Sequence, residues 1–195
     1  MHRLIVDVAR LEVARGYDGW LGRNPSPVLI SAAYSRTADD FRLMNRLVHR
    51  FDARKPFPET FQPNDPRRIE MASVYEGPLE FLVLLIALEQ DGGVDVQRLF
   101  GAVDRPDSLS VWREGGSDIE LQPLRDAPTT WSTPQAVHLL VGGSDAGRDC
   151  KSDKWIGASL LVVPASGGAR TGEYRFNVLS PDERNDWTAV LSVRH

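Results

Sequence analysis

Four histidines and one cysteine are the side chains of this 195-residue chain best suited to act as a general base, a nucleophile or a transition-metal ligand. No two histidines have the spacing that places a pair on one helical face, as in His-Glu-x-x-His. His138 alternates with Val137 and Leu139, which is typical of a hydrogen-bonded histidine in a sheet. Cys150 lies in a polar loop beside Lys151, and the pattern predicts an exposed thiol without a nearby base. The histidines are His2, His49, His138 and His195.

Larger catalytic motifs do not occur in the sequence. It contains neither Gly-x-Ser-x-Gly nor the glycine-rich loop that binds phosphate before a Lys-Ser/Thr pair. Asp and Glu are abundant enough to supply the carboxylate pair of a glycoside hydrolase, but no spacing selects two of them. We therefore expect a non-enzymatic protein without catalytic residues.

Two of the five tryptophans, Trp20 and Trp131, lie in loops rich in Gly, Thr and Pro. An exposed indole in such a loop can stack on a sugar ring or anchor a protein partner. Core packing is the alternative for these two, and it is the expectation for Trp112, Trp155 and Trp187. The loop tryptophans are the basis of one alternative function, a β-sandwich that binds carbohydrate or hydrolyses glycosides.

Basic residues recur at intervals of four at Arg46, Arg50 and Arg54, followed by Lys55. On a helix these residues would form one positive stripe, which can dock on an acidic protein or on a membrane surface. The alternative is an ordinary solvated face.

Charge and composition narrow the class of protein. The chain has 23 Lys and Arg against 27 Asp and Glu, a net charge of 23 − 27 = −4, and its arginines are interspersed with acids. This distribution argues against a nucleic-acid partner. The hydrophobic fraction of 42% and the charged fraction of 26% are those of a globular protein, and the length predicts one domain over residues 1–195.

The cellular compartment is predicted from three features. A single cysteine excludes an intrachain disulfide and a cysteine-based zinc site, and it suits a reducing compartment. Asp7 interrupts what would have to be the apolar part of a signal peptide. The longest apolar stretch, 79–88, has about half of the ~20 residues that a membrane-spanning helix needs. We expect a cytoplasmic protein.

Alternating apolar and β-branched residues predict at least eight strands, separated by loops rich in Gly, Pro, Ser and Asp. At most two short helices fit, one of them over 94–103, and repeated βαβ alternation is missing. We therefore expect a mainly β fold, an antiparallel eight-stranded sandwich with one or two short helices in the connections. The predicted strands cover 4–13, 28–34, 69–74, 79–88, 109–112, 119–124, 136–141, 155–163, 173–179 and 187–193.

Two segments need a separate interpretation. In 37–51, Thr37 is a possible cap and apolar residues follow at helical spacing, but the short mixed pattern fits a strand equally well.

Residues 56–66 contain four prolines in eleven positions and predict an extended loop or arm within the domain. The free carbonyls of such an arm suit pairing with the sheet edge of another copy or another protein.

The two ends of the chain resemble a C2 domain, the eight-stranded sandwich that often binds calcium and acidic lipid. At the N-terminus, the strand 4–13 is followed by Gly16-Tyr17-Asp18-Gly19 and by Ser26-Pro27-Val28, where the family usually has Asp-Pro-Tyr. At the C-terminus, the strand 137–141, an acidic loop and Asp153-Lys154-Trp155-Ile156-Gly157 resemble the family's strand, calcium loop and Asp-aromatic-Ile-Gly. Residues 37–133 have features that an ordinary C2 domain lacks.

The resemblance implies a calcium site at Asp18, Asp145, Asp149 and Asp153, because calcium takes about six to eight oxygen ligands and a sandwich converges carboxylates at its loop ends. The spacing departs from the family, whose third loop usually has Asp-x-Asp. Asp145 and Asp149 are four residues apart, with Arg148 between them. Solvated turn residues are the alternative.

These observations together favour a non-enzymatic, C2-like interaction or assembly module that binds protein partners or copies of itself. The alternatives are calcium-dependent targeting to a membrane through the four aspartates, and carbohydrate binding or hydrolysis. The candidate partner-binding residues are Trp20, Trp131, Arg46, Arg50 and Arg54.

Overall fold

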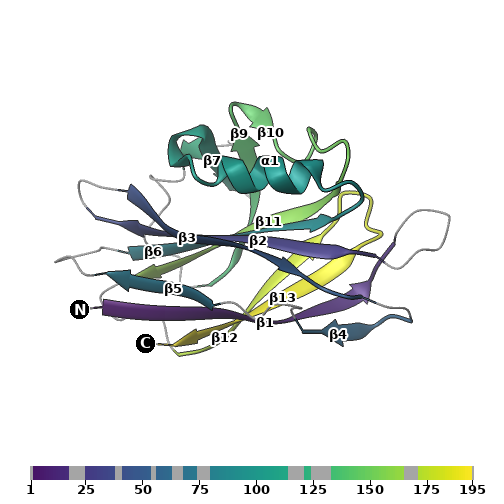
Figure 1. Ribbon diagram of the computed structural model, residues 1–195, viewed down its shortest axis with the longest axis horizontal. Coiled ribbons are helices and arrows are strands. Elements are labelled where there is room, and N and C mark those ends of the chain that lie inside the picture. The colour runs from purple at the N-terminus through teal and green to yellow at the C-terminus, as the bar shows by residue number, and fades with distance from the viewer. Residues whose placement is uncertain are drawn as a thin grey trace.

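Two antiparallel β-sheets stacked on each other make up most of the protein in a computed structural model (Figure 1). The structure describes residues 2–17, 25–37, 41–53, 56–62, 68–73, 80–113, 121–123, 133–164 and 171–194. The prediction of a mainly β antiparallel sandwich is confirmed. The strand count of eight is wrong, because thirteen strands, β1 to β13, lie within the described residues.

The first sheet is built around β1, which pairs with other strands on both of its sides. One side of β1 pairs with β13, and β13 pairs with β12, which ends the sheet. The other side pairs with β5 over residues 2–7 and with β4 over residues 11–13. The strands are β1 (His2–Arg15), β4 (Glu59–Phe61), β5 (Arg68–Ser73), β12 (Gly172–Leu179) and β13 (Asp186–Arg194).

The second sheet is wider, with the order β3-β2-β6-β11-β9-β7-β8 and the two-residue β10 paired to β9. Six of its strands, β2, β6, β7, β8, β9 and β11, were predicted within a few residues of their observed bounds, while the sequence of β3 fits a helix and a strand equally well. The strands are β2 (Pro27–Arg36), β3 (Phe41–Arg50), β6 (Glu80–Glu89), β7 (Leu109–Arg113), β8 (Leu121–Pro123), β9 (Gln135–Val141), β10 (Ser144–Asp145) and β11 (Lys154–Pro164).

A central strand, β6, is buried at all ten of its residues because the second sheet is covered on both faces. One face packs against the first sheet, where Leu85, Phe176 and Trp187 belong to a single apolar cluster. The other face packs beneath α1 (Val94–Ala102), where Leu84 and Leu99 belong to a second cluster. Burial on both faces explains why 79–88 is almost continuously apolar rather than alternating. The fold therefore has three layers (Figure 1).

The helix α1 forms the third layer and lies over β2 and β3, and its apolar side chains belong to one cluster with those of β7 and β9 (Figure 1). A short 3-10 turn at Pro106–Ser108 links α1 to β7. The prediction of a helix over 94–103 is confirmed. Among the described residues, no helix is both long enough and apolar enough to cross a bilayer.

Residues 41–50 form strand β3 rather than a helix, so the helical stripe of arginines does not exist. β3 pairs with β2 along its full length, with one register shift opposite Ala33 and Tyr34. The shift adds a residue to β3, and strict two-residue alternation is lost there. As a result Met44 and Leu47 face the core between the sheets while Val48 faces the core under α1, a spacing that resembles that of a helix.

The described part of the proline-rich segment, residues 56–62, lies against the first sheet of the same chain. Its β4 pairs with β1, and Phe57 and Phe61 pack edge to face at 6.4 Å on the core between the sheets. A Cβ at Gly16 would lie 2.8 Å from the Phe57 ring, so glycine is needed there for this packing. Residues 63–66 of the predicted arm lie outside the described residues.

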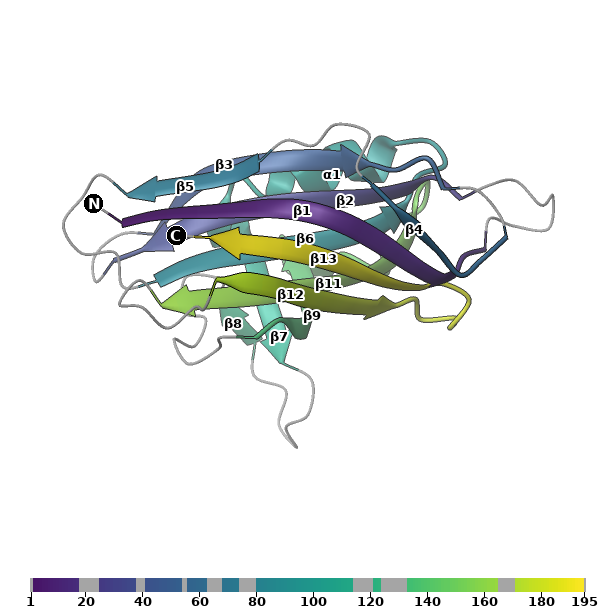
Figure 2. The same cartoon turned by 90° about the horizontal axis from the view of Figure 1, so that it is seen from below.

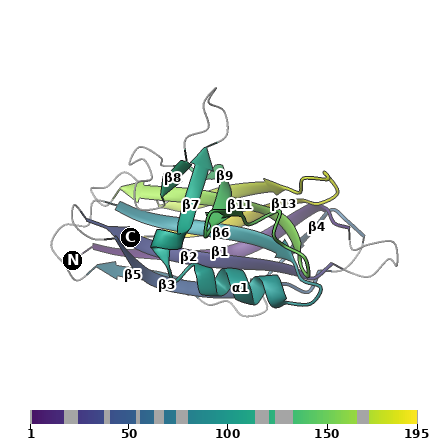
Figure 3. The same cartoon turned by 90° about the horizontal axis from the view of Figure 1, so that it is seen from above.

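The two lateral sides of the sandwich differ. On one side β5 contacts β2 and β3 and so bridges the two sheets. On the other side the first sheet ends at β12, while β9, β7 and β8 carry the second sheet further out (Figures 2 and 3). We call this second side, between β12 and β9, the open side of the sandwich.

Because β6 is buried on both faces, shortening one of its apolar side chains should cost far more stability than shortening an exposed apolar side chain. Leu84→Ala removes a fully buried side chain and should lower the free energy of unfolding by about 2–5 kcal/mol. Val94→Ala, on a side chain that is 63% exposed at the start of α1, should change it by less than about 0.5 kcal/mol. Urea denaturation of both variants measures this, and similar losses for the two would contradict the three-layer core.

Candidate functional site

The open side of the sandwich contains a cleft of about 440 Å³. Its walls are formed by residues 136–138 of β9, 155–158 of β11 and 177–179 of β12. The turn that follows β12 contributes Ser180, Pro181 and Glu183. A volume of this size is within the range of pockets that bind small molecules or single side chains.

Close contact between β11 and β12 forms the inner part of the cleft. A Cβ at Gly157 would lie 3.2 Å from the Cβ of Val178, so the absence of a side chain lets the two strands approach. Val178 is buried, whereas the next residue, Leu179, is 49% exposed. The cleft therefore passes from an apolar interior to an exposed leucine at the strand end.

Trp155 supplies the aromatic wall of the cleft. Its side chain is partly buried and packs against the core under α1, so the expectation of a core tryptophan holds for only part of its surface. A Cβ at Gly147 would lie 2.9 Å from the indole Cδ1, which shows how tightly the turn after β10 holds the ring edge. The indole is thus packed on one edge by this turn and on part of its surface by the core.

The turn 180–185 holds Glu183 in the left-handed region with φ 58°. The Glu183 N–H donates to the Ser180 carbonyl at 2.8 Å, and the Ser180 N–H donates to the Asn185 carbonyl at 2.9 Å. The Ser180 hydroxyl donates to Asp182 at 2.5 Å. These bonds fix an unfavourable backbone conformation for a residue other than glycine.

Asp182, next to Glu183, is already engaged within the turn. Lys154 Nζ lies 2.9 Å from its carboxylate. Burial alone would raise the pKa of Asp182, but hydrogen bonds from Ser180 and Lys154 lower it to about 2. Asp182 is therefore ionised and paired, whereas Glu183 has no ion pair within the described residues.

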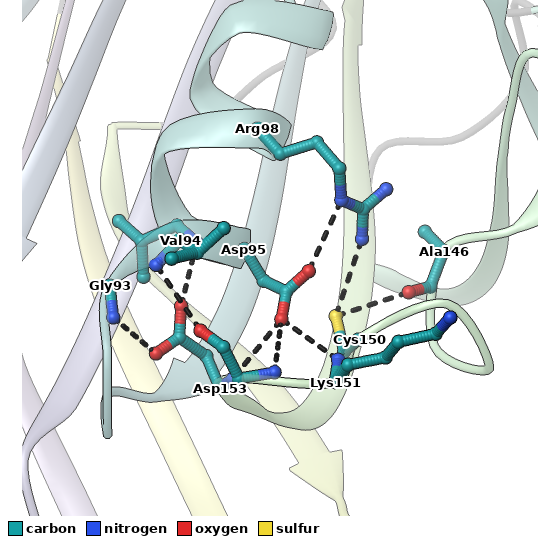
Figure 4. A network of polar contacts seen from close by, with 10 residues as sticks. Gly93, Val94, Asp95, Arg98, Ala146, Cys150, Lys151 and Asp153 are labelled. Atoms are coloured by element: carbon teal, nitrogen blue, oxygen red, sulfur yellow. Dashed lines mark hydrogen bonds and ion pairs between the residues drawn. The ribbon is translucent and has the colours of Figure 1, made fainter.

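Asp153, a candidate calcium ligand, is instead buried and bonded to the backbone around the start of α1 (Figure 4). Its Oδ1 accepts the N–H groups of Asp91, Gly92 and Gly93 at 3.0, 3.0 and 2.6 Å. Its Oδ2 accepts the N–H of Val96 at 2.9 Å. Free N–H groups at a helix start need such acceptors, and the N-cap residue Gly93 has no side chain to offer.

Asp95 makes the reciprocal contact from the first turn of α1. Its Oδ2 accepts the N–H groups of Lys151, Ser152 and Asp153 at 2.9, 2.8 and 3.1 Å. Its Oδ1 accepts from Arg98 at 3.2 Å. We call this arrangement of Asp95 and Asp153 the aspartate clasp, since each carboxylate binds the backbone that carries the other.

Both carboxylates of the clasp are stabilised in the ionised form. Burial raises the pKa of each, but the backbone donors outweigh it, and both pKa values lie below the ordinary value for aspartate. Sequence analysis missed Asp95 and gave Asp153 a different role. The sequence did contain an indication of this contact. Glycines before a helix offer no capping side chain, so a residue distant in the chain has to accept the free N–H groups.

The other candidate calcium ligands do not join Asp153. Asp145 Oδ1 accepts the N–H groups of Gly147 and Arg148 at 2.8 and 3.2 Å, a local turn contact. Asp149 is exposed, and Asp18 lies outside the described residues. Across the part of the chain that the structure describes, no group of three or more His, Cys, Asp or Glu side chains is placed to hold a metal ion.

Cys150 is half-buried beside the aspartate clasp (Figure 4). Its thiol donates to the Ala146 carbonyl at 3.2 Å, and Arg98 lies 3.7 Å from the sulfur. Burial, more than any nearby charge, raises the thiol pKa to about 11. The expectation of an exposed thiol is corrected, and the raised pKa makes the thiolate scarce at neutral pH.

The candidate partner-binding residues are scattered. Arg46 pairs with Asp104, and its guanidinium lies 4.2 Å from the centroid of the Phe100 ring, so it ties β3 to α1. Arg50 is exposed at the end of β3. Arg54, Trp20 and Trp131 lie outside the described residues.

Comparison with models of known protein families finds none that matches the chain. A search of curated protein sequences finds no match either. The resemblance to C2 domains therefore stays a prediction from the sequence.

The aspartate clasp predicts a specific effect of Asp153→Asn. The amide keeps one acceptor but directs its NH2 group at backbone donors, so the free energy of unfolding should fall by about 1–3 kcal/mol. Asp149→Asn, on an exposed neighbour, is the matched control and should leave stability unchanged. Thermal melts with calcium and with a chelator distinguish this account from a calcium site, which would make the loss depend on calcium.

The lowered pKa values of the clasp also predict a pH dependence. An aspartate whose pKa is lower in the folded state than in the unfolded state stabilises the fold. This stabilisation is complete at pH values above the unfolded-state pKa of about 4. That contribution is lost as the pH falls from about 4 through the lowered, folded-state pKa. The stability difference between the wild type and Asp153→Asn should therefore shrink in this acidic window, which denaturant titration at successive pH values measures. A difference that stays constant would contradict the ionised clasp.

Proposed function

We propose that this protein is a non-enzymatic interaction module that binds an extended segment of a partner protein along β12. In this proposal the segment adds a strand to the first sheet, and its side chains enter the cleft on the open side. Strand addition is a common mode of peptide recognition, in which main-chain hydrogen bonds supply affinity and neighbouring pockets supply specificity. The observation that carries the proposal is a cleft lying directly beside the terminal strand of a sheet.

The edge of β12 supports this proposal. β12 pairs with β13 along all eight of its residues, and no other described strand pairs with it. The backbone groups that point away from β13 thus have no strand partner within the described ranges. Such a row of donors and acceptors is a template for another extended chain.

The distribution of charge along β12 favours the half beside the cleft. Glu173 and Arg175 lie in the first half and form ion pairs with Arg10 at 2.7 Å and with Glu12 at 3.1 Å. Charged side chains are a common protection of exposed edges. The second half, 176–179, carries no charged residue and adjoins the cleft.

The width of the second sheet favours a single segment over a second copy of the domain. β9, β7 and β8 extend laterally beyond β12, so they flank the side on which an added strand would lie (Figures 2 and 3). One extended segment can lie in that space. A second sandwich continuing the first sheet would bring its own wide sheet against β9 and β7.

The described acidic and thiol groups with shifted pKa values support binding rather than catalysis. Asp95 and Asp153 accept backbone donors, Asp182 is paired with Lys154, and burial keeps Cys150 protonated. Each has a structural role that uses its polar atoms. A catalytic base or nucleophile instead needs a free polar atom directed at a substrate.

Carbohydrate binding is a second proposal, because one observation favours it. The cleft combines the indole of Trp155 with the polar side chains of Asn177 and His138, and sugars are bound by stacking and hydrogen bonds of this kind. Calcium-dependent membrane targeting, the function that the C2 resemblance implies, has no such support, since Asp153 is engaged in the clasp.

The proposed function predicts that a phage-displayed library of random peptides, each as long as the eight-residue β12, contains binders that protect β12. Hydrogen exchange of the chain with a selected peptide should slow the β12 amides that face away from β13. Leu179→Lys should weaken binding about tenfold, since it places a charge at the cleft end of the edge. Val94→Lys, on the other exposed large apolar residue, which lies on α1, should leave affinity unchanged.

Three results would contradict this function. A library without binders is one, and peptides that protect only other segments are another. Sedimentation showing a dimer with protected β12 in the absence of peptide is the third, since the partner would then be a second copy. A glycan array that yields a ligand blocked by Leu179→Lys would favour carbohydrate instead.

A further inference from the structure

We propose that the cleft receives an arginine side chain of the bound segment, with the guanidinium stacked on Trp155 and paired with Glu183. This inference rests on the proposed function, because it names the chemistry that the segment must carry. It follows from three features of the cleft: its charge, the ordered backbone of its one acidic residue and its aromatic wall.

The charge of the cleft is set by Glu183, which is the one carboxylate among its lining residues. The two basic side chains near the turn are already occupied. Lys154 pairs with Asp182 at 2.9 Å, and its Nζ lies 5.3 Å from the centroid of the Tyr17 ring. The guanidinium of Arg184 lies 4.7 Å from the same ring. No described basic side chain forms an ion pair with Glu183. In this proposal its partner is therefore a cation of the bound segment.

The position of the Glu183 backbone is held by the turn. Its φ of 58° is maintained by its bond to Ser180 and by the bond from Ser180 to Asn185. Hydrogen bonds from Ser180 and from the Arg184 N–H to Asp182 stabilise the same turn. Because the backbone of Glu183 is already ordered, pairing with a ligand orders only its side chain.

The aromatic wall selects the kind of cation. Trp155 is the ring type that binds cations best through its face, and Gly147 holds its edge in place. Arginine is planar and weakly hydrated, so it stacks on an indole and pairs with a carboxylate at the same time. Lysine has a compact, strongly hydrated charge and does not match both surfaces as well.

The experiment that tests this inference is a double-mutant cycle between Glu183 and the arginine of a peptide selected from the library. We expect one arginine to recur among the selected peptides at a single position. Replacing it with citrulline, which keeps the shape but not the charge, should weaken binding to the wild type about tenfold by calorimetry. The same replacement should have almost no effect on binding to Glu183→Gln. Glu59→Gln, on an exposed residue of β4 at the other edge of the sheet, is the control and should behave as wild type.

The results separate this inference from the proposed function. Two results would overturn the inference and leave strand addition standing. One is a set of peptides that protect β12 but carry no recurring arginine. The other is an arginine whose replacement by citrulline weakens binding to Glu183→Gln as much as to the wild type. A library without binders to β12 would overturn both. Lysine recurring at that position in place of arginine would overturn the stacking on Trp155.

Discussion

Burial of the second sheet on both faces is the constraint on which the rest of the structure depends. β6 has no exposed residue, so its two faces need separate apolar covers. The first sheet covers one face, and α1 with β7 and β9 covers the other. The second sheet continues past β11 with β9, β7 and β8, whereas the first sheet ends at β12. The open side beside β12, and the cleft in it, are consequences of that difference in width.

The aspartate clasp is the polar counterpart of this apolar packing. A helix laid across a sheet brings its free N–H groups close to the apolar core, where unpaired donors are costly. Asp153, which comes just before β11, accepts those donors, and Asp95 returns the contact to the backbone before β11. The clasp thus joins the helix to the sheet that it covers. It does so with acidic residues that resemble metal ligands in the sequence.

Sequence patterns predicted the parts of the fold that depend on local spacing. The continuous apolar run of β6, the alternation of β12 and β13 and the helix after Gly93 all follow from neighbouring residues. The contacts that build the site are distant in the chain. Asp95 and Asp153 are separated by 58 residues, and the cleft joins three strands and a turn. Trp155 has an ordinary core pattern, and its place in the lining of the cleft depends on the end of the first sheet at β12.

The most direct test of the account is hydrogen exchange of the free chain, resolved at single amides by NMR. An open edge predicts that alternate amides of β12 exchange quickly while their neighbours, bonded to β13, exchange slowly. The amides of β6, which pairs with strands on both sides, should all be slow. Slow exchange at every amide of β12 would contradict the central claim, because the edge would then be covered within the chain itself.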